Sequence, residues 1–403
     1  MLTRNRYLLC TVLVCLGAGS ALAQASMADF QQALREKAAF NEHDFAALQL
    51  NQPVVRLVPA TDKREVAVTG LVNINASAEE FLRSYRDSMM RKNNNAILEI
   101  GSFGNEPALA DLDGLTLEPG DIDDLKECVV GDCQIKLSAP MIERFQKEID
   151  WDAPDYQLRV TNLFKQMLVA YVKDYRARGE TALIEYNDKT DSVSLAAEQR
   201  ALTSAAGYVS SFLTDTKSGL QLLQETLVWS KIKFGLKPVI SVNHISIYKR
   251  NSDAGPQVLI ASKQIYANHY FNAFLALTAF VNVPGTTNAS YLVYENRSRA
   301  DGLEGPFGKL KRGVVEKKAL EGLRGIIAQS KMSLDGPLLT ASTAELSTSE
   351  SYGWGQRLFG GIRPLLWLTV LSALIALLVL GRRRTDNVTA AKGKALKPES
   401  VKS

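Results

Sequence analysis

The stretch VAVTGLVNINASAEEFLRSYRD, residues 66–87, joins a strand pattern directly to the start of a helix. Residues 65–73 alternate between two sets of side chains, as a half-buried strand requires, because successive strand residues point to opposite faces. Ser77 and Glu80 then have the spacing of a capping box, in which the two side chains satisfy backbone N–H groups reciprocally. The sequence therefore predicts a strand followed at once by a helix that ends near residue 92.

The rest of the chain between the termini adds helices in the middle and strands towards the end. Helical spacing of apolar residues predicts helices at 140–178 with a break near Pro154, at 195–234, and at 309–332 as a long amphipathic helix. Alternation and β-branched residues predict strands at 96–103, 181–186, 237–248, 257–271, 273–283 and 289–296. Residues 111–126 are acidic and rich in turn formers. The fold class predicted from this order is α+β.

This order of a strand, a capped helix, late antiparallel strands and a closing helix resembles the helix-grip fold of the START-like superfamily, in a bacterial, membrane-anchored form. The residues that carry the resemblance are 66–87 and YLVYENRSRADGLEGPFG, residues 291–308. The resemblance covers about half of the exported part, and residues 111–235 are longer and more helical than the connection typical of the family. It implies an antiparallel sheet around the C-terminal helix, with an apolar cavity suited to lipids, sterols or polyketides.

Both ends of the chain carry apolar segments. Residues 1–23 combine two arginines, a short apolar run and Ala21-Leu22-Ala23, the pattern of a cleaved secretory signal. An uncleaved anchor is the alternative, but an apolar run of about ten residues is too short for a bilayer core of about 30 Å. Near the other end, residues 364–381 carry no charge and predict a transmembrane helix at 363–381. A buried core helix is the alternative there.

Three arginines follow the predicted transmembrane helix, at 382–384, so the positive-inside rule places the C-terminus in the cytoplasm. The expected location is the bacterial inner membrane, with a single pass and a periplasmic N-terminal domain. The predicted divisions are a signal peptide (1–23), an N-terminal extension (24–64), a START-like domain (65–333) with a helical insertion (about 140–234), a flexible linker (334–362), the transmembrane helix (363–381) and a basic tail (382–403).

Cysteine and histidine usage bounds the chemistry of the exported domain. Once Cys10 and Cys15 leave with the signal peptide, Cys128 and Cys133 remain, and their closeness around a Gly-Asp turn predicts a hairpin disulfide. A metal site and dithiol redox chemistry are the alternatives. Zinc needs four ligands, but the three histidines, His43, His244 and His269, are scattered along the sequence. No CxxC or HExxH spacing occurs either, so no metal or cofactor is predicted.

Charge and motifs exclude several classes of function. Lys and Arg number 47 against 43 Asp and Glu, and much of the basic excess lies in the tail, so nucleic acid is not expected as a partner. The acidic residues at 111–124 lack the spacing of an EF-hand and are interpreted as a solvated loop. No nucleophile elbow, Walker loop or Rossmann glycine pattern occurs, so no catalytic residue is assigned.

The densest group of polar and aromatic residues is SKQIYANHYF, residues 262–271. In a strand, Lys263 and His269 would share one face and Tyr266 and Tyr270 the other. An inward Lys or His would anchor a ligand or act as a base, whereas an edge position would leave both side chains solvated or satisfied. The candidate ligand-binding residues are Lys263, Tyr266, His269, Tyr270, His244, Tyr294 and Arg297. For Arg297, pairing with Glu295 is the structural alternative.

Three functions are consistent with this sequence. The first is a membrane-anchored envelope protein that binds an apolar or lipid-like ligand in a helix-grip cavity, with the lipid bilayer as a partner. The second is an enzyme acting on a hydrophobic substrate, with Lys263, His269 or His244 as acid or base. The third is a non-catalytic scaffold that docks a protein partner of unknown identity through the helical insertion at 140–234.

Overall fold

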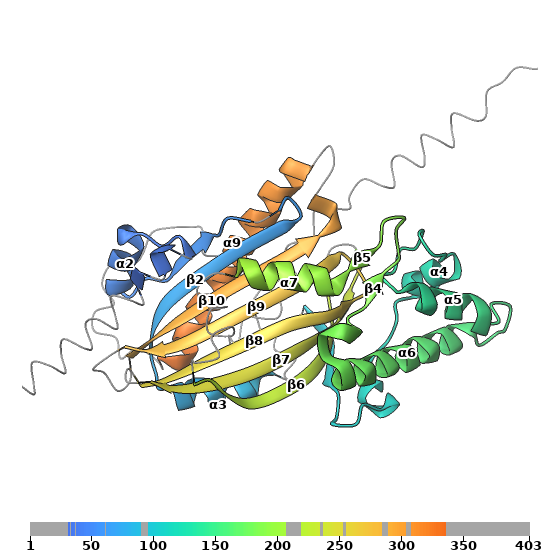
Figure 1. Ribbon diagram of the computed structural model, residues 1–403, viewed down its shortest axis with the longest axis horizontal. Helices are drawn as coiled ribbons and strands as arrows, with labels where there is room; N and C mark the ends of the chain where they lie inside the picture. The colour runs from blue at the N-terminus through green and yellow to red at the C-terminus, as the bar shows by residue number, and fades with distance from the viewer. Residues whose placement is uncertain are drawn as a thin grey trace, which may run out of the picture.

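An eight-stranded antiparallel sheet forms the centre of the protein in the computed structural model, with strand order β1-β2-β10-β9-β8-β7-β6-β3 (Figure 1). The structure describes residues 31–335 except 33, 37, 61, 90–95, 207–218, 234–236, 253–254, 284–288 and 304–307. The strands are β1 (Val54–Leu57), β2 (Glu65–Asn75), β3 (Ile97–Ser102), β6 (Gln221–Ile232), β7 (Val239–Ser252), β8 (Gly255–Ala267), β9 (Phe271–Asn282) and β10 (Ala289–Ala300). Strands β4 (Glu185–Tyr186) and β5 (Val193–Ser194) form a separate two-stranded sheet.

Helices cover both faces of the large sheet. They are α2 (Glu42–Gln49), α3 (Ala78–Met89), α4 (Pro119–Lys126), α5 (Ala139–Glu148), α6 (Tyr156–Arg178), α7 (Leu195–Ala205) and α9 (Gly308–Leu334), with short 3-10 turns at Leu109–Leu112, Gly179–Ala182 and Asp301–Leu303. Figure 1 shows α7 in front of the sheet and α3 and α9 behind it. We call the side covered by α3 and α9 the inner face, and the side covered by α6 and α7 the outer face.

The inner face is packed against α3 and α9 by interlocking side chains. Helix α9 lies against β2, where Gly70 permits a close approach: a β-carbon at this position would lie 3.0 Å from Cγ1 of Ile327. On α3, the ring of Phe81 stacks on that of Phe280 with centroids 4.5 Å apart. Both rings are fully buried, so this end of the inner face is filled by side chains.

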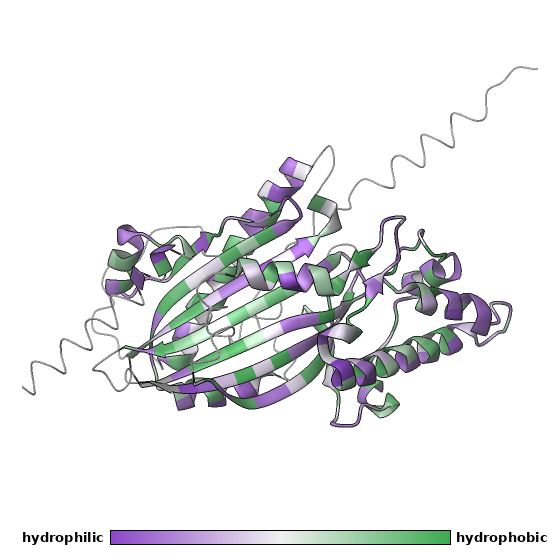
Figure 2. Ribbon diagram, in the orientation of Figure 1, coloured by the Kyte–Doolittle hydropathy of each residue, from purple (hydrophilic) through white to green (hydrophobic). Residues whose placement is uncertain are grey.

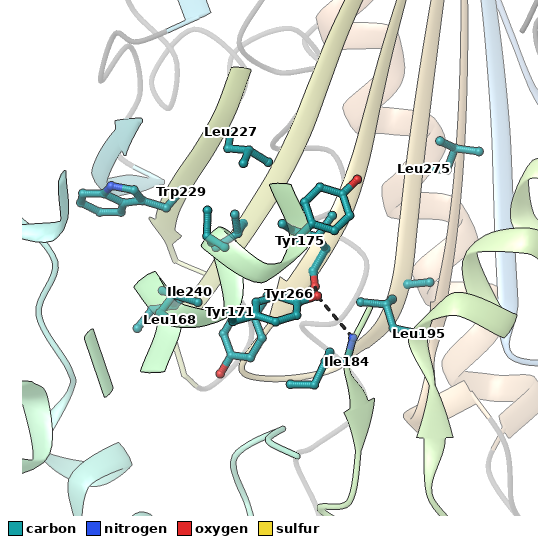
Figure 3. Packing of buried hydrophobic residues seen from close by; sticks show 14 of the residues in the cluster. Leu168, Tyr171, Tyr175, Ile184, Leu195, Leu227, Trp229, Ile240, Tyr266 and Leu275 are labelled. Atoms are coloured by element: carbon teal, nitrogen blue, oxygen red, sulfur yellow. Dashed lines mark hydrogen bonds between the residues drawn. The ribbon is translucent and has the colours of Figure 1, made fainter. Parts of the chain in front are cut away.

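The outer face holds an aromatic layer that fixes the segment between β3 and β6 to the sheet (Figure 3). The hydroxyl of Tyr171 on α6 donates to the carbonyl oxygen of Ile265 at 2.6 Å and accepts from the N–H of Ile184 at 3.3 Å. The ring of Tyr266 packs edge-on against Tyr171. Cys128 and Cys133 form the predicted disulfide within the same segment.

Several predicted elements are confirmed. Strand β2 begins at the predicted residue, and the capping box is present: the N–H of Ser77 donates to the Glu80 carboxylate at 2.8 Å and the N–H of Glu80 donates to the Ser77 hydroxyl at 3.3 Å. Helices α5 and α6 meet at the predicted break, and α9 matches the predicted closing helix.

Three element predictions are wrong in their extent. The predicted helix at 195–234 ends at Ala205, and Gln221–Ile232 forms strand β6 instead. The predicted strand at 257–271 ends at Ala267, after which the chain turns, with Tyr270 at φ 62°, and β9 begins. The predicted strand at 181–186 shortens to the two residues of β4. The first error arises because β6 is buried on both faces in its second half, so its apolar residues lack alternation.

The predictions of a transmembrane helix and of a single-pass inner-membrane location are corrected. The described residues form an α+β fold, and none of their helices combines the length and the apolar character needed to cross a membrane. Helix α9 has 27 residues, but its exposed side carries charged residues such as Lys317 and Arg324. The predicted segments at 1–23 and 363–381 lie outside the described residues.

Candidate functional site

Polar side chains gather in the middle of the inner face, among the apolar residues that pack against α3 and α9. On β10, Leu292 and Tyr294 face inward, and Asn296 shares their face because every second residue of a strand points to the same side. On β8, Ser262 and Gln264 follow the inward-facing Ile260 in the same way.

The register of the sheet brings together Ser262, Gln264 and Asn296, which we call the inner polar cluster. Ser262 lies opposite Ala276 of β9, and Ala276 lies opposite Asn296 of β10, so the three residues form one row across the sheet. Since neighbouring strands are about 4.8 Å apart, the backbones of Ser262 and Asn296 are about 10 Å apart. Gln264 lies about 7 Å along β8 from Ser262, opposite Asn243. The side chain of Ala276, between the two polar residues, is only a methyl group.

Four buried polar atoms of this cluster lack a hydrogen-bond partner among the described residues. They are the Ser262 hydroxyl oxygen, Oε1 of Gln264, and Oδ1 and Nδ2 of Asn296. The three residues are 5 %, 2 % and 0 % exposed. An unsatisfied buried polar group costs about 1–3 kcal/mol, so native proteins usually supply a partner from the chain, from water or from a ligand. The trio of Ser262, Gln264 and Asn296 is therefore one place with unfilled hydrogen-bonding capacity. The buried Ser330 hydroxyl on α9 is another, and the Asn296 amide also acts on the Tyr294 phenol.

The surroundings of the inner polar cluster are uncharged. The inward-facing residues of β8, β9 and β10 near the cluster are apolar, aromatic or neutral polar; they are Val258, Ile260, Phe274, Thr278, Phe280, Leu292 and Tyr294. Burial raises the pKa of Tyr294, and the adjacent Asn296 amide opposes that rise. Burial likewise raises the pKa of Tyr85 on α3. Both phenols are therefore protonated at neutral pH and can act as hydrogen-bond donors.

Two of the predicted ligand-binding residues, Lys263 and His244, lie opposite each other on the outer face. Nζ of Lys263 is 2.7 Å from the Glu180 carboxylate. Nδ1 of His244 lies 2.9 Å from the hydroxyl of Tyr175, and its Nε2 lies 3.2 Å from the Glu225 carboxylate. These contacts join α6 and the turn after it to the sheet. Tyr175 is buried, whereas the Glu180 and Glu225 side chains are 58 % and 48 % exposed.

His269 and Tyr270 lie in the turn between β8 and β9 and contact other segments of the chain. Nε2 of His269 is 3.0 Å from Oδ1 of Asp121 on α4, and both side chains are buried. The Tyr270 hydroxyl accepts from the N–H of Lys237 at 2.9 Å, and its ring packs against the inner core. The pair of His269 and Asp121 thus ties α4 to the end of the sheet.

Tyr266 and Arg297 belong to the outer face, whereas Tyr294 faces inward. The Tyr266 hydroxyl donates to the carbonyl oxygen of Lys136 at 3.2 Å within the aromatic layer. Arg297 pairs with the Glu65 carboxylate at 2.6 Å and with Glu295 at 2.7 Å, which is the structural alternative considered for it. The seven predicted residues are therefore spread over several places and do not form one site.

Ser262, Gln264 and Asn296 are not among the candidate ligand-binding residues predicted from the sequence, although Ser262 and Gln264 belong to the polar and aromatic stretch 262–271. Each occupies an inward position of a strand that also carries buried apolar residues on that face, such as Ile260 on β8 and Leu292 on β10. This mismatch is the available signal, because a polar residue on the buried face of a strand needs a partner. It becomes visible only once the inward face of β8 and β10 is known.

Acid pH should destabilise the protein partly through His244. Burial lowers the pKa of His244 below its usual value of 6.5, with Lys263 acting in the same direction and Glu225 against it. The unfolded chain therefore takes up this proton first, and the free energy of unfolding should fall as the pH drops through about 6.5 towards the lower folded-state pKa. Denaturant unfolding at several pH values between about 7 and about 5 should show a flatter dependence for His244→Gln. The exposed His43, changed to Gln, is the control and should leave the slope unchanged.

Comparison of the chain with protein-family models, with curated proteins and with solved structures gives no match. The inner polar cluster, with its unfilled hydrogen-bonding capacity, is the feature of the described residues from which we argue a function.

Proposed function

We propose that the protein binds an uncharged, largely apolar small molecule on the inner face of the sheet, beside α3 and α9. The observation that carries this proposal is the set of buried, unpartnered polar atoms on Ser262, Gln264 and Asn296. Their surroundings are apolar and aromatic. Small-molecule sites usually have this composition, with an apolar lining and a few polar groups directed at the ligand.

The arrangement of the sheet and the closing helix supports a likeness to START-like ligand-binding proteins as part of this proposal. Strands β6 to β10 follow one another in the sheet, β2 joins beyond β10, and α9 packs against β2 and β1. The Phe81–Phe280 stack occupies one end of the inner face, so we place the ligand away from it, towards Ala276 and the inner polar cluster.

The test uses Ala276, which lies between Ser262 and Asn296. Full-length protein, prepared without detergent, should bind a neutral, environment-sensitive apolar dye saturably, and Ala276→Met should abolish binding while leaving the midpoint of denaturant unfolding nearly unchanged. The added side chain then fills the space that the ligand would occupy. If that space were already packed, the same change would cost about 1–3 kcal/mol by overpacking.

Ala279 provides the matched control, because it lies on the same strand and is equally buried but packs in the outer core. Ala279→Met should lower the unfolding midpoint and retain dye binding. Absence of saturable binding by the wild-type protein, or loss of stability without loss of binding in Ala276→Met, would contradict the proposed function.

A further inference from the structure

Asn272 occupies a β-bulge near the start of β9. The pairing of β9 with β10 shifts between Phe271 and Ala273, so Asn272 is the extra residue of the bulge. A bulge redirects the side chains next to it. Phe271 packs in the inner core and Ala273 in the outer core, and the side chain of Asn272 meets Lys136 of the segment between β3 and β6.

Backbone hydrogen bonds hold Lys136 and Asp188 beside this bulge. The N–H of Lys136 donates to the carbonyl oxygen of Asn268 at 2.8 Å. The carbonyl oxygen of Asp188, in the loop after β4, accepts from the N–H of Cys133 at 2.9 Å. The side chains then meet at Asn272: Nζ of Lys136 donates to Oδ1 of Asn272 at 2.8 Å and lies 3.7 Å from Oδ2 of Asp188.

The meeting point of these three side chains is closed to solvent. Lys136, Asp188 and Asn272 are 3 %, 6 % and 0 % exposed. Nζ of Lys136 also lies 5.1 Å from the centroid of the Tyr186 ring, which is fully buried. An amine, a carboxyl group and a side-chain amide are thus enclosed together, away from the bulk water that favours the charged forms of the first two.

We infer that Lys136 and Asn272 are joined by an isopeptide bond between Nζ and Cγ, with Asp188 carrying the proton. The bond is a modification of the chain on the outer face, so the inference is independent of the proposed ligand site on the inner face. It fixes the segment between β3 and β6 covalently to β9, in addition to the disulfide of Cys128 and Cys133 that closes a hairpin within that segment.

The reaction exchanges one amide nitrogen for another and releases ammonia. It begins with transfer of a proton from Nζ of Lys136 to the Asp188 carboxylate, which replaces two buried charges by a neutral amine and a carboxylic acid. The amine adds to Cγ of Asn272 and forms the new C–N bond. Asp188 then gives its proton to Nδ2 of Asn272 and takes one from Nζ, the Cγ–Nδ2 bond breaks, and NH3 leaves. The products are a secondary amide and a protonated Asp188, so no oxidant, reductant or further reactant is needed.

The distances suit this reaction. Because a carbonyl carbon lies about 1.2 Å from its oxygen, Nζ of Lys136 is within about 4 Å of Cγ of Asn272. Reactive intramolecular pairs have their reacting atoms about 3–3.5 Å apart, which a small rotation of either side chain achieves. Since the fold holds both groups, their encounter costs no further translational entropy.

Lys231 is a buried lysine with a different environment. It is 3 % exposed like Lys136, but its Nζ lies 2.6 Å from the Glu118 carboxylate and 2.7 Å from the Thr116 hydroxyl. A carboxylate and a hydroxyl stabilise an ammonium group. Lys136 instead lies closer to an amide oxygen than to Oδ2 of its carboxylate partner, which places the amine near an acyl carbon that can lose ammonia.

The test is the mass of the full-length protein, denatured and with its disulfide reduced, followed by a tryptic peptide map. The wild type should lack the mass of one ammonia molecule. Trypsin should leave the bond after Lys136 uncut and release one branched peptide that joins the sequence around Lys136 to the sequence around Asn272. The map is needed because other reactions of Asn and Gln side chains also release ammonia.

Two variants assign the roles of the amine and the carboxylate. Lys136→Arg removes the nucleophile, and Asp188→Asn keeps the amine and the amide but removes the proton carrier. Both should lose the branched peptide and have the full mass of their sequences. Lys231→Arg is the matched control and should keep the branched peptide. The map of the wild type decides the inference even if a variant fails to fold.

The contrary outcomes are equally defined. Separate peptides with an unmodified Lys136 and an unmodified Asn272 in the wild type would overturn the inference, and so would a loss of ammonia carried only by an unbranched peptide. Persistence of the branched peptide in Asp188→Asn would overturn the role of Asp188 as the proton carrier. None of these measurements involves a ligand, so they are separate from the test of the proposed function.

Discussion

Replacing Arg297 by methionine should lower the free energy of unfolding by about 3–5 kcal/mol. The guanidinium is 2 % exposed and lies between two buried carboxylates, Glu65 at 2.6 Å and Glu295 at 2.7 Å. Methionine fills much of the same volume but leaves two carboxylates near each other at a low local dielectric, with Arg299 3.5 Å from Glu65. Removal of one partner from a buried ionic group is costly because the remaining charges are desolvated with less compensation.

Denaturant unfolding of the full-length protein measures the difference in stability between the wild type and Arg297→Met. Arg159 on α6 forms an exposed pair with Asp155 at 2.8 Å, so Arg159→Met is the control and should not shift the midpoint. If Arg297→Met shifted the unfolding midpoint as little as Arg159→Met, the buried ion pairs of Arg297 would add no net stability.

Local patterns predicted the elements whose two sides differ in environment. The capping box at Ser77 and Glu80 places the start of α3 correctly because its hydrogen bonds lie within one turn. Helix α9 was predictable because one side packs on β2 while charged residues such as Lys317 lie on the other. Amphipathic periodicity records this difference directly in the sequence.

Elements buried on both sides could not be predicted in this way. The second half of β6 packs Leu227 and Trp229 on the outer face and Val228 on the inner face. Figure 2 shows hydrophobic stretches along the central strands, where such burial removes the alternation. A continuous apolar run is compatible with a buried helix as well as with a buried strand, so the pattern of residues 221–232 does not distinguish the two.

The candidate site depended on contacts between distant residues. Ser262 and Asn296 share a row only through the pairing of three strands, which composition and spacing do not reveal. Conversely, the conspicuous residues Lys263 and His269 contact Glu180 and Asp121, both in the segment between β3 and β6. These residues are conspicuous in the sequence because charged and aromatic side chains bind the segment between β3 and β6 to the sheet. Residue type alone did not distinguish a contact between segments from a ligand site.

Replacing Phe81 by alanine should lower the free energy of unfolding by about 3–5 kcal/mol, the usual cost of removing a fully buried aromatic side chain. The ring is 0 % exposed, stacks on Phe280 at 4.5 Å and lies 6.4 Å from Tyr85. Its loss removes the stacked contact between α3 and β9 and leaves a cavity in the inner core. The denaturant midpoint should be highest for the wild type, lower for Phe81→Leu and lowest for Phe81→Ala.

Phe145 on α5 is the matched control, because it is as fully buried but belongs to the outer core. Phe145→Ala should cost a similar free energy of unfolding, yet under folding conditions only Phe81→Ala should change the affinity for the neutral dye. An enlarged inner space would admit a bulkier apolar molecule and hold a small one less closely, so the preference should shift towards longer probes. Equal dye affinities in the two alanine variants would mean that Phe81 does not border the ligand, and would restrict the binding space to the strands around Ala276.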